Sequence, residues 1–203
     1  MQQTSHLRRF VIVGHNATTA GTFSLNDLAG ATGRLDVLLR CVNSALFTSH
    51  GIRQDTEVRL LLLGQPNAPK TITLKGREIK HLNPDERSTA ALLKEALNKP
   101  IFGNSVGAGP GISVSRAIFK DILADAAKDS KLIALKEDGT DIRAAGLAPP
   151  LTFFLSDNRD FSDDELQALK DAGATFISLG PKSLLASHCV VIAHNEIDRT
   201  QIL

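Results

Sequence analysis

Three charged residues close together in the sequence have types and a spacing that could do chemistry. Asp36 and Arg40 are four positions apart, and Arg34 lies two residues before Asp36. In a helix, Asp36 and Arg40 would form an ion pair worth a few tenths of a kcal/mol, which is a purely structural role. Two guanidinium groups beside one carboxylate, next to a glycine-rich turn, would equally suit a polar substrate. The residues alone leave both interpretations open.

Three loops in the last third of the chain follow predicted strands and could form a binding site. They span residues 135–139 (LKEDG), 155–158 (LSDN) and 179–184 (LGPKSL). In open α/β sheets, ligands bind beyond the carboxyl ends of the strands, where backbone N–H and C=O groups can recognise an adenine edge. Taken one at a time, each loop is more typical of an ordinary turn.

The glycines at positions 103, 107, 109 and 111 suggest a phosphate-binding loop, but their context argues against it. A dinucleotide fingerprint must leave a strand and open directly into a helix, and a P-loop needs a terminal Gly-Lys-Ser/Thr. Neither condition is met. We therefore expect residues 103–111 to form a flexible crossover.

The histidines and cysteines give no metal-binding pattern. His15, His50 and His194 each end an apolar segment, and no HxH or HExxH spacing connects them, so we expect structural roles. Cys41 and Cys189 form no CxxC motif. Two unpaired thiols are typical of a reducing cytosol, and we predict a protein without a metal.

The pattern of apolar residues predicts strands that alternate with helices. The predicted strands are residues 11–13, 58–63, 70–76, 112–114, 132–135, 151–155, 175–179 and 190–193. The predicted helices are residues 34–47, 83–97 (with Asn83 as N-cap), 115–127 and 162–172 (with a Ser162–Glu165 capping box). This alternation indicates an α/β fold with a largely parallel sheet. We see no linker and expect one domain over residues 1–203.

Charge and hydropathy narrow the function classes. The apolar run near the N-terminus is too short for a signal peptide or a membrane span, which predicts a cytoplasmic protein without a membrane partner. The net charge of +1 argues against a generic nucleic-acid coat protein. Residues 1–103 are basic overall and residues 104–203 are acidic, either because one surface meets a polyanion or by chance together with an acidic helix.

Several segments along the chain together resemble one protein family. They are residues 10–15, 23–28, 33–47, 49–53, 82–88, 109–112, 135–139 and 194–198. The longest reads GRLDVLLRCVNSALF, and residues 82–88 read LNPDERS. This set resembles the TrmY family, the tRNA pseudouridine N1-methyltransferases of the SPOUT superfamily.

The resemblance implies an α/β fold with a C-terminal trefoil knot, a homodimer, and S-adenosyl-L-methionine bound by the knot loops. Matched motif by motif, the cofactor-binding residues are Leu135, Ser156, Leu179, Gly180, Pro181, Lys182, Ser183, Leu184 and Cys189. Ser156 stands where relatives usually have a glycine. The implied partner is RNA, most naturally a tRNA.

The implied reaction is methyl transfer to N1 of a pseudouridine, which carries a proton because this base is joined to its sugar through carbon. We predict that Asp36 takes that proton as a general base, while Arg34 and Arg40 orient the base or stabilise its developing anion. The arginines expected to meet the phosphates of the RNA are Arg8, Arg9, Arg53 and Arg59.

Two other function classes stay open on the sequence. Ser156 is the one hint of a SPOUT-fold protein that binds S-adenosylmethionine and RNA but has another target or little activity. A small-molecule α/β enzyme unrelated to RNA is disfavoured by the basic first half and by the segment of residues 33–53.

Overall fold

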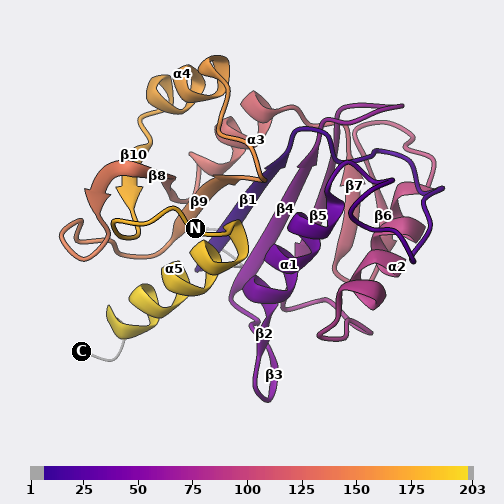
Figure 1. Ribbon diagram of the computed structural model, residues 1–203, viewed down its shortest axis with the longest axis horizontal. Coiled ribbons are helices and arrows are strands. Elements are labelled where there is room, and N and C mark those ends of the chain that lie inside the picture. The colour runs from indigo at the N-terminus through magenta and orange to yellow at the C-terminus, as the bar shows by residue number, and fades with distance from the viewer. Residues whose placement is uncertain (1–6, 201–203) are drawn as a thin grey trace.

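The computed structural model describes residues 7–200, and in that range the chain forms one eight-stranded sheet with helices on both faces (Figure 1). The strand order is β10-β8-β9-β1-β4-β5-β7-β6. The strands are β1 (Arg8–Gly14), β4 (Thr56–Leu62), β5 (Lys70–Lys75), β6 (Ser105–Gly109), β7 (Ile112–Ser115), β8 (Lys131–Asp141), β9 (Leu151–Ser156) and β10 (Thr175–Ser178). A separate small hairpin joins β2 (Phe47–Thr48) to β3 (Gly51–Ile52).

The sheet is parallel from β10 through β4 and antiparallel beyond it. The pairs β10–β8, β8–β9, β9–β1 and β1–β4 are parallel, whereas β5, β7 and β6 continue the sheet with antiparallel pairings. Every residue of β1 is buried, as is usual for a parallel strand covered on both faces. The prediction of an α/β fold with a largely parallel sheet is confirmed.

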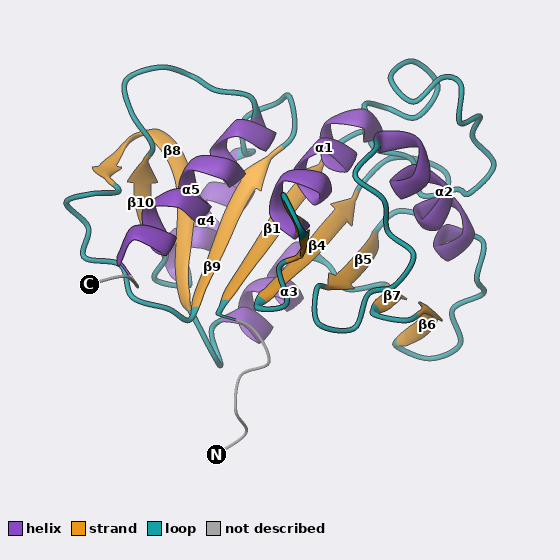
Figure 2. Ribbon diagram, turned by 90° about the horizontal axis from the view of Figure 1, so that it is seen from below, coloured by secondary structure: helices purple, strands orange, loops and turns teal. Residues whose placement is uncertain are grey.

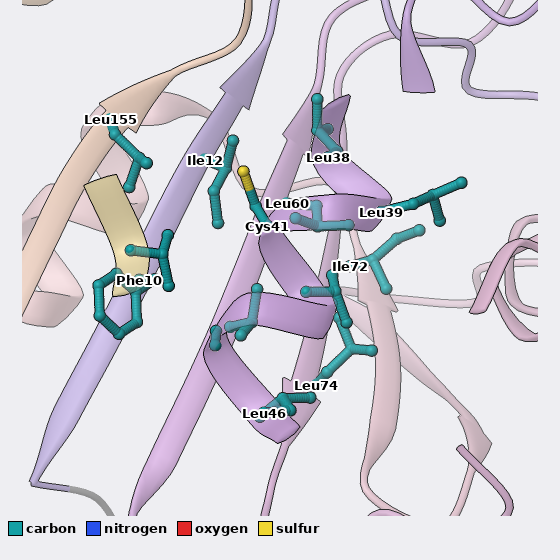
Figure 3. Close-up of a cluster of buried hydrophobic side chains, with 14 of the residues drawn as sticks. Phe10, Ile12, Leu38, Leu39, Cys41, Leu46, Leu60, Ile72, Leu74 and Leu155 are labelled. Atoms are coloured by element: carbon teal, nitrogen blue, oxygen red, sulfur yellow. The ribbon is translucent and has the colours of Figure 1, made fainter. Parts of the chain in front are cut away.

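Two helical layers cover the two faces of the sheet (Figure 2). The helices α1 (Leu35–Leu46), α2 (Glu86–Leu97) and α5 (Ala186–Thr200) pack on one face, and α3 (Phe119–Ala126) and α4 (Asp163–Asp171) pack on the other. A hydrophobic core lies on each face of the sheet, the larger one under α1, α2 and α5 and the smaller one under α3 and α4. Residues of β1 contribute alternately to the two cores, because successive side chains of a strand point to opposite faces. Phe10 and Ile12 lie in the larger core with Leu38 and Leu60 (Figure 3), and Val11 and Val13 lie in the smaller one.

Several predicted elements differ from the structure. The predicted strand at residues 190–193 is wrong, because Val190, Ala193 and Ile197 are buried at helical spacing within α5. A short β-branched run is compatible with a buried helix as well as with a strand. The prediction of a flexible crossover at residues 103–111 is wrong, because residues 105–109 form β6 and residues 110–111 turn into β7. Helix α3 begins at Phe119 rather than at position 115.

The start of α2 also differs from the prediction. Asp85, not Asn83, is the N-cap, and its side chain accepts a hydrogen bond from the Ser88 N–H at 2.7 Å. The capping box at the start of α4 is confirmed: the Ser162 hydroxyl accepts from the Glu165 N–H, and the Glu165 carboxylate accepts from the Ser162 N–H.

Both edges of the sheet are short and irregular. At one edge, β10 has four residues, and its register against β8 shifts between Phe176 and Ile177. At the other edge, the glycine-rich β6 has five residues, and its register against β7 shifts between Gly107 and Gly109.

Over residues 7–200, none of the helices has the length and apolar character needed to cross a bilayer.

Candidate functional site

A pocket of about 680 Å³ opens where the parallel strands β8, β9 and β10 lead into their loops. Each of these strands contributes an apolar lining residue: Leu135 from β8, Leu155 from β9 and Ile177 from β10. Parallel strands end at the same edge of a sheet, and this edge is where open α/β sheets bind ligands. The volume lies within the range of about 300–1,000 Å³ typical of small-molecule sites.

The three loops singled out in the sequence meet in this pocket. The predicted cofactor-binding residues that line it are Leu135, Ser156, Leu179, Gly180, Lys182, Ser183, Leu184 and Cys189. Pro181 is exposed and does not line the pocket. The first and third loops are joined directly, since the Ser183 hydroxyl donates to the Glu137 carboxylate at 2.9 Å.

Gly180 gives the third loop a turn that other residues would strain. Its φ of +132° is a conformation that side-chain-bearing residues rarely adopt. The Ser178 hydroxyl bridges this turn, because it donates to the Gly180 carbonyl at 3.1 Å and accepts from the Gly180 N–H at 3.3 Å. The backbone of this loop is therefore held beside the pocket.

Arg34 and Arg40 line the pocket from the start of α1, and Asp36 lies behind them. Asp36 is 5% exposed and is not a lining residue. Arg34 donates to both of its oxygens, at 3.0 and 3.1 Å, and Arg40 donates to one of them at 2.8 Å. Burial alone would raise the pKa of Asp36, but these hydrogen bonds outweigh burial and hold the pKa below its usual value.

The loop between β9 and α4 contributes lining residues that the sequence prediction missed. Asn158 ends the predicted second loop (residues 155–158) but was not among the predicted cofactor residues, and Arg159, Asp160 and Phe161 follow directly after it; all four line the pocket. Lys136 and Glu137 in the first loop also line it. All these residues are next to residues that match the family motifs, which could have marked them as candidates. Loop residues have no periodicity, however, that would predict which side chains point into the pocket.

His15 connects the end of β1 to this loop. Its ring Nδ1 lies 3.3 Å from both Asp157 Oδ1 and Ser156 Oγ, and its Nε2 lies 3.0 Å from Glu165 Oε2. The hydrogen bond to Asp157, and to a lesser extent the one to Glu165, raise the pKa of His15 to about 9. The expectation of a structural histidine did not foresee this contact between β1 and the pocket loop.

Cys189 lines the pocket from the first turns of α5 and is half-buried. Burial, with a further contribution from the negative charge of Glu137, raises the pKa of its thiol. Because only the thiolate is a strong nucleophile, Cys189 is suited to contact a ligand rather than to attack one.

The prediction that Arg8 and Arg9 meet RNA phosphates is wrong. Their exposed fractions are 1% and 2%, because they lie in a central strand and point to opposite faces of the sheet. Arg8 pairs with Asp198 at 2.6 Å and Arg9 with Glu57 at 2.7 Å.

Arg53 and Arg59 are also held in ion pairs. Arg53 donates to both oxygens of Asp198, and Arg59 pairs with Glu57 and Asp125, each at 2.7 Å. Their side chains are mostly covered. Four arginines that looked available in the sequence are thus engaged within the fold.

Among residues 7–200, no three His, Cys, Asp or Glu side chains are grouped so that they could hold a metal ion.

Comparison with solved structures defines the fold class. The chain is similar to Nep1 from Archaeoglobus fulgidus, which was solved bound to S-adenosylhomocysteine, with a TM-score of 0.66 and 14% identity. The match covers 97% of this chain and 100% of that one. The fold is therefore the SPOUT-like α/β class expected from the resemblance.

Comparison of sequences then gives the family. Residues 7–202 match the family model described as "Putative SAM-dependent RNA methyltransferase", and the chain belongs to this family. Curated relatives named tRNA (pseudouridine(54)-N(1))-methyltransferase include one from Haloarcula marismortui, 47% identical over 95% of this chain and 96% of its own. Another, from Methanosarcina acetivorans, is 44% identical over 96% of this chain and 92% of its own. The resemblance to the TrmY family is confirmed.

Proposed function

We propose that this protein transfers a methyl group from S-adenosylmethionine to N1 of a pseudouridine in tRNA, at the position 54 that its relatives' names specify. The observation that carries the proposal is the meeting of the three predicted loops around one pocket, with Arg34 and Arg40 at its side. Membership of a methyltransferase family over nearly the whole chain supports it.

The residues of the pocket fit S-adenosylmethionine, which supplies an activated methyl group on its sulfonium. The side chains of Leu135, Leu179 and Leu184 offer apolar surface for an adenine, and the backbone of their loops offers polar groups for its edge. The turn at Gly180 leaves the space around that residue open, since no atom lies within 4 Å of the position of a Cβ.

Arg34 and Arg40 are proposed to stabilise the negative charge that develops on the pseudouridine as N1 loses its proton. Fixed guanidinium groups aimed at developing charge are an efficient form of electrostatic catalysis. Asp36 orients both of them through its three hydrogen bonds. Its role as general base stays a prediction. The geometry favours positioning instead, because a carboxylate with a lowered pKa and with both oxygens bonded to guanidinium groups is a weak base.

We propose that the C-terminal segment forms the trefoil knot of the SPOUT class. The connection from β8 to β9 carries Arg143, which pairs with Glu196 of α5 at 2.9 Å. Ile142 and Leu147 of that connection share the larger core with α5. These contacts bring the connection against the helix that follows β10, as threading requires. We also propose a single domain for residues 1–203, although residues 1–6 and 201–203 lie outside the described range.

A homodimer is proposed on the basis of an exposed apolar strip beside the pocket. Leu184, Leu185 and Val191 are exposed along the third loop and the first turns of α5. Large exposed aliphatic side chains that lie together typically mark an interface. A second copy covering this strip would also close the side of the pocket formed by Leu184 and Leu185. Because tRNA is the proposed substrate, we place the activity in the cytoplasm.

The alternative of a weakly active relative rested on Ser156. Its hydroxyl lies within hydrogen-bond distance of His15, so the larger residue is accommodated by a polar neighbour. No contact of Ser156 favours this alternative.

Calorimetric titration with S-adenosylmethionine tests the cofactor site. The wild type should bind, and Gly180→Trp should abolish binding because it strains the turn and fills the pocket. Gly173→Trp is the matched control, since Gly173 also has a positive φ (+75°) and open space but lies outside the pocket. A wild type that does not bind, or a Gly180→Trp variant that binds normally, would contradict the assigned site.

A methylation assay tests the substrate. A tRNA carrying pseudouridine at position 54 should accept the methyl group, whereas the same tRNA with uridine there should not, because N1 of uridine is bonded to the sugar. Methylation of the uridine form would show that another atom is the acceptor.

A further inference from the structure

The loop between β9 and α4 lies between two carboxylates that both contact His15, Asp157 at its start and Glu165 in the first turn of α4. At its beginning, Asp157 accepts from the His15 backbone N–H at 2.9 Å and lies 3.3 Å from the ring Nδ1. Beyond its end, in α4, Glu165 lies 3.0 Å from the ring Nε2 and accepts from the N–H of Ser162, the last residue of the loop, at 2.8 Å. The segment between these two anchors contains Asn158, Arg159, Asp160 and Phe161, all of which line the pocket.

The position of His15 explains how one side chain reaches both anchors. It follows β1, and β1 pairs in parallel with β9 in a register that places Val13 beside Ser156. His15 therefore emerges next to the start of the loop. Glu165 approaches from the first turn of α4, where the capping box fixes it. The ring lies between two carboxylates that come from different elements.

The charges around His15 favour its protonated form. Asp157 faces it from the loop and Glu165 from α4, while the charge of Arg34, the residue before α1, interacts with that of Asp157. The side chains of Asp157 and Glu165 are 1% and 10% exposed, so an uncompensated charge on either would be costly. With both ring nitrogens protonated, the imidazolium donates to both carboxylates at once, which neutral imidazole cannot do.

We infer that His15 is a positioning residue for the methyl-transfer site: as an imidazolium bonded to Asp157 and Glu165, it holds residues 156–162 in the shape that lines the cofactor pocket. The inference rests on the proposed function, which assigns this pocket to S-adenosylmethionine. It adds a residue outside the three cofactor loops and makes cofactor affinity depend on the charge of one histidine. His15 is a positioning residue because it acts through the loop and is not itself a lining residue.

Affinity for S-adenosylhomocysteine, measured by calorimetry on the full chain, tests this inference. At about pH 7.5, His15→Gln should weaken binding roughly tenfold or more, because glutamine cannot donate to both carboxylates. At about pH 10, above the pKa of about 9, most wild-type rings should be neutral, so the ratio of the dissociation constants of His15→Gln and the wild type should narrow towards one. Comparing this ratio at both pH values cancels the titration of the ligand itself. His50→Gln, in the exposed turn between β2 and β3, is the matched control.

Hydrogen exchange supplies a readout that does not depend on ligand binding. In His15→Gln, amides of residues 156–166 should exchange faster, while those of β5 and β7 should exchange as in the wild type. Glu165→Gln is a second variant that leaves the pocket lining intact and should weaken binding in the same direction.

Two results would overturn the inference. One is unchanged affinity of both variants at about pH 7.5. The other is a ratio of the dissociation constants of His15→Gln and the wild type that is the same at about pH 7.5 and about pH 10. A failure of the proposed function would give a different pattern of results in calorimetry and hydrogen exchange. If the wild type binds no S-adenosylhomocysteine, the pocket assignment is lost, but faster exchange of the loop in His15→Gln would still show that His15 holds it.

Discussion

Arg34 adopts a left-handed backbone conformation, with φ of 71°, and folds its guanidinium back onto Asp36, whose two oxygens it contacts at 3.0 and 3.1 Å. A non-glycine residue in this conformation is uncommon, and such residues often occur at functional sites. The contact turns the side chain of the residue before α1 towards the pocket. The same carboxylate holds Arg40 one helical turn further on.

Replacing Asp36 with asparagine separates its two possible roles. If Asp36 only orients Arg34 and Arg40, we expect kcat to fall about tenfold with a pH–rate profile of unchanged shape. If it is the general base, kcat should fall by roughly 10²–10⁴ and the remaining rate should rise with pH. Single-turnover methylation of a pseudouridine-containing tRNA across a pH range measures both quantities. A rate equal to that of the wild type would exclude either role.

Replacing Ser156 with glycine tests whether this residue impairs the site. The substitution removes a hydroxyl 3.3 Å from His15 Nδ1 but keeps the contacts of His15 with Asp157 and Glu165. Because Asp157 remains as an acceptor for the same Nδ1–H, we expect the Kd for S-adenosylmethionine to change less than about tenfold, which is about 1.4 kcal/mol. A larger gain in affinity or turnover in calorimetry and methylation assays would show that Ser156 weakens this enzyme.

His194 should make the protein lose stability on mild acidification. Its Nε2 lies 3.0 Å from the Ala45 carbonyl and its Nδ1 lies 3.1 Å from Arg8 Nη1, so Nε2 donates, Nδ1 accepts and the ring is neutral. Burial, then the charges of Arg53 and Arg8, lower the pKa of His194 from 6.5 to about 3.

The direction of this effect follows from where the proton binds. Between about pH 6.5 and pH 3 the unfolded chain binds a proton that the folded chain excludes, so stability is lost as the pH falls, by up to about 1.4 kcal/mol per pH unit. Urea unfolding of the wild type and of His194→Gln measures the difference. Glutamine can keep a donor and an acceptor there, so its pH dependence should be flatter. His50→Gln should follow the wild type, and equal slopes in all three proteins would contradict the assignment.

Replacing Val191 with aspartate should dissociate the proposed dimer. Val191 is 50% exposed, and a charge in an apolar interface would be desolvated without a partner. Light scattering after gel filtration should give a dimer mass for the wild type and a monomer mass for Val191→Asp. Ile118→Asp is the control, because Ile118 is 46% exposed but precedes α3, which covers the other face of the sheet. A monomeric wild type would refute the dimer.

The sequence was most informative where burial imposed a pattern. The apolar runs of β1, β4 and β9 predicted central strands, and the spacing of Leu35, Leu38 and Leu39 predicted α1. It was misleading at Val190, where a β-branched run belongs to α5. Only contact with the rest of the core decides between a helix and a strand in such short apolar runs.

The contacts of charged residues were harder to predict from the sequence than the strands and helices. Arg8 and Arg9 precede an apolar run, and nothing in that order reveals that their partners lie as far away in the chain as Asp198 and Asp129. The contacts of His15 with Asp157 and Glu165 likewise depend on the order of strands in the sheet. The family motifs located the loops because they match residue types at known positions, but they did not show which residues hold those loops.

The irregular edges of the sheet also limit how two copies can associate. A straight edge strand exposes a row of unpaired N–H and C=O groups on which another chain can add a strand. At β10 and β6 the rows are short and interrupted by register shifts, and β6 is rich in glycine, so neither offers a continuous template. Association by extending the sheet is therefore disfavoured, and so is fibrillar growth. A second copy would then associate through side chains rather than backbone, as proposed above for the exposed residues of the third loop and α5.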